Sequence, residues 1–174
     1  LLSKTSRNPS GTELRRTLAR LRLELELRPD LALETVAQAL RTEPHNGALL
    51  TDQAEYFLAS GDLSSATVAA QAALQTESDP VLRVYGSLWG WTAARLRMQT
   101  EEQRVWGERL LTEYSKLPNT ESVEARPAMT QLMIMAQSQL KQSLPLTDVL
   151  ATFAILSGPN TATKVQDLRK RLLP

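Results

Sequence analysis

The feature that most constrains the fold is a sequence pattern that returns after thirty-four residues. The segment QALRTEPHN at 38–46 is followed by the related segment AALQTESDP at 72–80. A repeat of this length indicates that each copy is one structural unit. The matching positions are Ala32, Ala39, Leu40, Thr42 and Glu43 in the first copy and Ala66, Ala73, Leu74, Thr76 and Glu77 in the second. Such periods are typical of arrays in which every repeat buries one face against its neighbours.

Helical periodicity runs along most of the chain. Four apolar positions recur at i, i+4, i+7 and i+11 and form one stripe of a helix, namely Leu14, Leu18, Leu21 and Leu25. That helix should end near residue 28, because Pro29 disfavours helical geometry in the residue before it. Further helices are expected at 31–42, 48–59, 63–75, 81–98, 101–116, 127–142, 147–156 and 161–172. No stretch shows the alternation of a strand, so the sequence predicts an all-α fold.

The repeat resembles the tetratricopeptide repeat, whose unit is a helix hairpin of this length. The first unit matches the second-helix features of that family, with Ala32 at the helix crossing, the pair Ala39-Leu40 and Pro44 at the turn. The second unit matches both helices, with Ala54, Phe57, Gly61-Asp62, Ala66 and Ala73-Leu74. The resemblance covers about residues 13–114 and is strongest over 31–80.

The sequence also departs from the family pattern. Arg20 stands where the first unit should have a small crossing residue, and Leu27-Arg28-Pro29 replaces the Gly-Asp turn. A third unit fits only with two or three inserted residues, which would place Gly90 at its helix crossing.

The resemblance implies a right-handed superhelical array of antiparallel helix hairpins over residues 13–116. Residues 1–12 would be an N-terminal extension, and residues 117–174 would be helices that pack on the array and cap it. It also implies a protein-interaction module, such as a scaffold, adaptor or assembly chaperone, that binds a peptide or helix of another protein in a concave groove.

The family register predicts which side chains line that groove. In the second unit they are Thr51, Glu55, Leu58 and Ala59. With two inserted residues the third unit adds Trp91 and Arg95, whereas a strict period adds Tyr85 and Trp89 instead. Three Trp lie within eighteen residues of a chain that has eight aromatic residues. We expect that they are not all buried and that one anchors a partner.

A function of another class remains open: a helical structural or oligomerisation domain of a larger protein. The two functions differ in what should be exposed. An adaptor should have a bare groove with an exposed Trp, whereas a structural domain should expose apolar side chains on its terminal helices. A homo-oligomer fits the second function. The Met-rich helix expected at 127–142 is interpreted mainly as core.

Charge argues against nucleic acid as a partner. Net charge is +1, and the acidic residues gather in the middle of the chain. The arginines of the first helix lie on both flanks of the leucine stripe, Arg15 and Arg22 on one side and Arg16 and Arg20 on the other. We interpret them as snorkelling residues rather than as one basic surface.

The sequence contains no pattern for catalysis or for a cofactor. It has no Cys, and the single His45 lies in a turn where we expect it to be exposed. No Gly-rich phosphate loop or metal-binding motif is present, so we expect no enzyme activity, cofactor or metal. No segment is apolar enough to span a membrane. The compartment stays open between cytoplasm and periplasm, and the lack of an initiating Met fits a segment of a longer or membrane-anchored protein.

Overall fold

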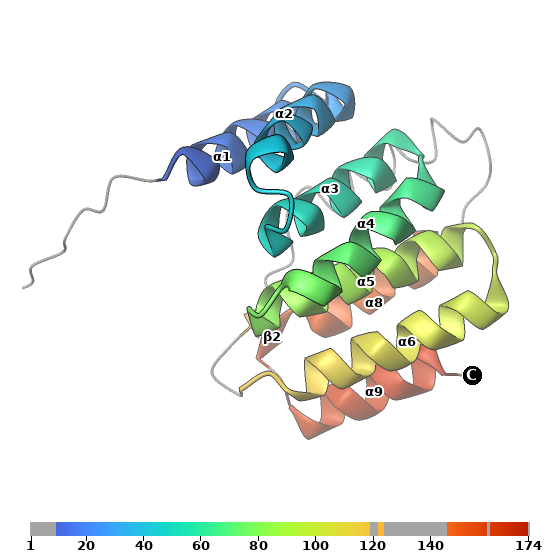
Figure 1. Ribbon diagram of the computed structural model, residues 1–174. Helices are drawn as coiled ribbons and strands as arrows, with labels where there is room; N and C mark the ends of the chain where they lie inside the picture. Colours follow the sequence, from blue (N-terminus) through green and yellow to red (C-terminus); the bar gives the residue numbers. More distant parts are fainter. Residues whose placement is uncertain (1–9, 119–121, 124–145, 160, 174) are drawn as a thin grey trace, which may run out of the picture.

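The computed structural model describes residues 10–118, 122–123, 146–159 and 161–173. Figure 1 shows that this part of the chain is helical, as predicted. Its helices are α1 (Gly11–Glu24), α2 (Pro29–Thr42), α3 (Gly47–Ser60), α4 (Leu63–Thr76), α5 (Pro80–Leu96), α6 (Thr100–Ser115), α8 (Leu146–Leu156) and α9 (Ala162–Leu172). The helix expected at 127–142 lies outside the described residues.

Two very short strands were not expected. The strands β1 (Ser122–Val123) and β2 (Gly158–Pro159) pair in an antiparallel ladder of two residues each. A ladder this short has no alternating pattern, which explains why the sequence did not reveal it.

Local side chains explain where most helices begin. Ser10 accepts a hydrogen bond from the Glu13 amide and Glu13 accepts one from the Ser10 amide, which is a capping box at the start of α1. Asn46, Asp62 and Asp79 cap α3, α4 and α5 in a similar way through their side-chain oxygens. Because a cap satisfies amides that would otherwise lack a partner, it sets the start of each helix.

The turns between paired helices repeat the period of the sequence. Leu27, Gly61 and Met98 all have a positive φ, of 54°, 81° and 55°. Leu27 and Gly61 are thirty-four residues apart, while Gly61 and Met98 are thirty-seven apart. The turn inside the third hairpin therefore comes three residues late, which agrees with the two or three inserted residues predicted for that unit.

The helices pack in the order of the chain. Each helix from α1 to α6 contacts the next, α9 packs on α6, and α8 packs on α9. In Figure 1, α1 and α2 lie at one end of the molecule and α6 and α9 lie at the other. Within the described residues, α1 is therefore the helix at one end of the stack.

All three Trp are buried, which corrects the expectation that at least one is exposed. The exposed fractions of Trp89, Trp91 and Trp106 are 0%, 3% and 4%. Phe153 of α8 meets the Trp89 ring edge-on at 6.2 Å between centroids. A Cβ atom on Gly90 would lie 2.3 Å from the Trp106 ring, so Gly90 lets α6 approach α5 closely.

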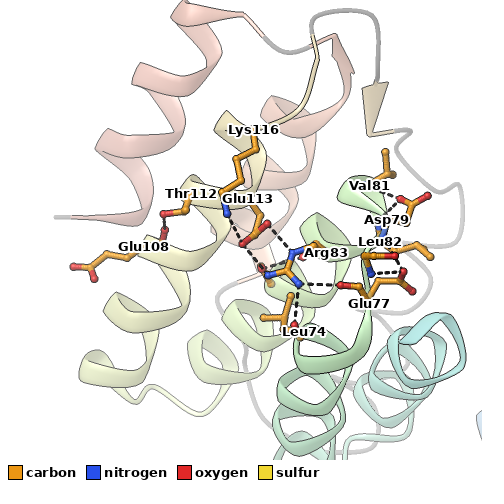
Figure 2. Close-up of polar contacts among 12 residues, drawn as sticks. Leu74, Glu77, Asp79, Val81, Leu82, Arg83, Glu108, Thr112, Glu113 and Lys116 are labelled. Carbon is orange, nitrogen blue, oxygen red and sulfur yellow. Dashed lines mark hydrogen bonds and ion pairs between the residues drawn. The ribbon is translucent and has the colours of Figure 1, made fainter. Parts of the chain in front are cut away.

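Arg83 joins three helices in one network of polar contacts, which Figure 2 shows. From α5, its guanidinium binds the Glu113 carboxylate of α6 with N–O distances of 2.9 and 3.1 Å. It also donates to the main-chain oxygens of Leu74 and Glu77 at the end of α4, at 2.8 and 2.9 Å. A cation at this place satisfies carbonyl groups that have no partner within the helix.

Candidate interaction surface

The stripe of leucines on α1 is exposed. Leu14, Leu18 and Leu21 of α1 expose 56%, 44% and 44% of their surface, and Leu25, the residue that caps its C-terminus, exposes 75%. The buried residues of α1 are instead Ala19 and Leu23, on the opposite face of the helix. We call the four exposed leucines the leucine face.

Ion pairs on the other side of α1 explain this orientation. Arg16 binds Asp52 of α3 with N–O distances of 2.6 and 3.1 Å, and Arg20 lies 3.5 Å from the same carboxylate. The Asp52 side chain is fully buried. Since a buried carboxylate is stable only when it is paired, Asp52 holds this side of α1 against α3.

Arg22 also bonds within the protein. Its Nη1 atom donates to the Thr35 hydroxyl at 2.5 Å and to the Leu31 main-chain oxygen at 3.3 Å. The interpretation of Arg16, Arg20 and Arg22 as snorkelling residues was therefore wrong. Their guanidinium groups bind α2 and α3, and it is the leucines that face solvent.

Most of the residues predicted to line the groove lie in the interior of the protein and not on the leucine face. The buried ones, each 6% exposed or less, are Thr51, Glu55, Leu58, Ala59, Tyr85, Trp89 and Trp91. The expectation that they line an open groove is not met, because side chains this buried offer no surface to a partner in this conformation. Partner binding by these residues stays a prediction.

Trp91 and Arg95 do line a cleft of about 930 Å³ between α5, α6, α8 and α9. Most of its cations pair with carboxylates. Arg95 binds Asp148, and Arg104 binds Glu101 at 2.6 Å. A cleft in which most cations already have carboxylate partners is a poor site for an anionic ligand.

The repeat period links the leucine face to the predicted groove. Leu21 stands thirty-four residues before Glu55, and Leu25 stands thirty-four before Ala59. The same positions are thus buried on α3 and exposed on α1. The sequence could have revealed this surface if the predicted inner positions had been carried back by one repeat.

The described residues include the single His and most of the helices, so they bear on metal binding and on membrane insertion. His45 is exposed in its loop, as predicted. No cluster of three or more His, Cys, Asp or Glu that could hold a metal ion occurs in the part of the chain that the structure describes. No helix within the same ranges has the length and apolar character needed to cross a bilayer.

Comparison with known proteins identifies no relative. No protein-family model, no curated protein and no solved structure matches the chain. The assignment of a function therefore depends on the surface of the molecule itself.

Proposed function

We propose that the chain is a non-catalytic, tetratricopeptide-like helical domain that binds protein through the leucine face of α1. It acts as a structural or oligomerisation domain. The observation that carries the proposal is the exposure of four leucines along one side of a terminal helix. Apolar surface gathered in this way is costly in water and is typical of a protein contact.

The exposure of side chains favours one of the two functions that the sequence suggests. An adaptor with a groove needs an exposed aromatic anchor, and all three Trp are buried. A structural domain needs apolar side chains on a terminal helix, and α1 provides them. The structural function is therefore better supported than the groove.

Photo-crosslinking in cells tests the proposal. A benzophenone amino acid replaces Leu21 in the full chain, and the control carries it at Val68 of α4, which is 70% exposed. We expect adducts of higher mass from position 21 and none from position 68. Adding Leu18→Glu to the position 21 protein should remove the adducts. The proposal fails if both positions give the same adducts or if position 21 gives none.

A further inference from the structure

The leucine face has the spacing of a coiled-coil seam. Successive leucines are four, three and four residues apart, which is the d, a, d, a order of a heptad repeat. Leu14 and Leu21 are the d positions, and Leu18 and Leu25 are the a positions. The face therefore fits another helix that runs alongside α1.

The two flanks of the seam carry opposite charges. With about 100° between successive residues, Arg15 and Arg22 lie on one flank, while Glu13 and Glu24 lie on the other. Arg15 and Glu13 are exposed, and Arg22 and Glu24 are half-buried. A helix that packs on the leucine face thus meets a basic edge and an acidic edge.

This pattern is complementary to itself in one orientation. When two copies of α1 lie parallel around a two-fold axis, the basic flank of each faces the acidic flank of the other. On this edge the exposed Arg15 of one copy faces the acidic flank of the other, while the Arg22 guanidinium stays bonded to Thr35 and Leu31 of its own chain. In the antiparallel orientation, Arg15 instead faces a second Arg22, and the like charges repel.

Among the described residues, the opposite end of the stack offers no comparable apolar face. There α9 packs on α6 through Leu168 and Leu172, which are buried. Its exposed residues include Gln166, Asp167 and Lys170. Association of two copies therefore joins α1 to α1 and closes after two chains, since a head-to-tail contact would have to place leucines against this polar surface.

We propose that the chain forms a parallel two-fold dimer through the leucine faces of its α1 helices. The proposal rests on the proposed function and names a second copy of the chain as the occupant of the surface. Because Leu14 and Leu25 are eleven residues apart, the seam is about 16 Å long. A contact of this size is at the small end of specific interfaces, so the dimer should dissociate on dilution.

Sedimentation equilibrium measures the association. The wild-type chain should shift, as its concentration rises, from 19.3 kDa toward twice that mass. Leu18→Glu should weaken the dimer at least a hundredfold, and Arg15→Glu at least fivefold, because Arg15→Glu places a carboxylate opposite the acidic flank of the other copy. Val68→Glu on the exposed surface of α4 is the control and should dimerise like the wild type. A wild-type chain that stays monomeric at millimolar concentration overturns the proposal.

The absence of Cys from the sequence allows a direct test of orientation. Leu14→Cys alone should form disulfide-linked dimers under mild oxidation, because a parallel axis places the two thiols side by side. In an antiparallel dimer those thiols would be about 16 Å apart. A mixture of Leu14→Cys and Leu25→Cys chains should give disulfides between like chains, and a majority of mixed disulfides contradicts the parallel arrangement.

The mass of the photo-crosslinked adducts separates this proposal from the proposed function. Adducts at twice the chain mass support the dimer. If position 21 crosslinks only to a different protein, the interaction surface stands and the dimer fails. If position 21 yields no adducts, both fail.

Discussion

Arg83 on α5 and Glu113 on α6 form a two-point ion pair, with Nε to Oε2 at 2.9 Å and Nη2 to Oε1 at 3.1 Å. The same guanidinium binds two carbonyl oxygens at the end of α4. One side chain thereby fixes the position of three consecutive helices. The contact is partly screened from water, because Arg83 is 28% and Glu113 is 11% exposed.

Removal of the guanidinium should destabilise the fold. Arg83→Met keeps much of the aliphatic stem and loses all four hydrogen bonds, so we expect it to lower the free energy of unfolding by about 2 kcal/mol. The control is Arg104→Met, whose partners Glu101 and Glu108 are exposed. It should change stability by less than about 0.5 kcal/mol. Urea denaturation followed by circular dichroism measures both, and equal losses would contradict a special role for Arg83.

The contribution of Glu113 should depend on pH. Hydrogen bonds from Arg83 hold the pKa of Glu113 below its ordinary value of 4.5. A carboxyl whose pKa is lower in the folded than in the unfolded state stabilises the fold fully above the unfolded value, and the stabilisation is lost as pH falls through the folded value. Wild-type protein should therefore be more stable than Glu113→Gln at pH 7, and the difference should shrink below pH 4.5. Denaturation curves from pH 7 to pH 3 test this, and a constant difference would refute it.

The left-handed turns offer sites for stabilisation. Leu27 and Met98 have positive φ, a conformation that costs residues with a Cβ about 1–2 kcal/mol. Replacing either with Gly relieves that cost but adds flexibility to the unfolded chain, so the net gain should be about 0.5–1 kcal/mol. Leu27→Ala and Met98→Ala are the matched controls and should give no gain, since Ala also has a Cβ. Thermal melting distinguishes them. Gly variants that melt at or below the wild-type temperature would show that these turns carry no strain.

Two glycines on α5 should respond in opposite ways to the same substitution. A Cβ on Gly90 would lie 2.3 Å from the Trp106 ring, whereas a Cβ on Gly86 would lie 3.5 Å from Leu74 in ordinary contact. Gly90→Ala should therefore cost about 1–3 kcal/mol by overpacking. Gly86→Ala should stabilise by up to about 1 kcal/mol, because Ala favours a helix. Chemical denaturation of both variants measures the difference, and a neutral Gly90→Ala would mean that α6 can move away from α5 at little cost.

Local sequence was enough to predict most of the helices. The caps at Asn46 and Asp62 and the left-handed Gly61 act within a few residues of themselves, so the bounds of α3 and α4 follow from short segments. The insertion of two or three residues predicted for the third unit agrees with the three-residue delay at Met98. These features depend on hydrogen bonds and backbone geometry that are settled inside one turn of chain.

Which face of a helix is buried depends on contacts far along the chain. The helix α1 has leucines on both sides, and periodicity alone favoured the stripe of four as the buried face. Asp52, thirty-six residues after Arg16, draws the arginine side of α1 against α3 and leaves the four leucines exposed. In the same way Trp89 is covered in part by Phe153, sixty-four residues later. The sequence by itself determined where helices form, because hydrogen bonding within a helix is local. Only the tertiary structure decided which side chains face solvent, because burial requires a neighbouring element to be in place.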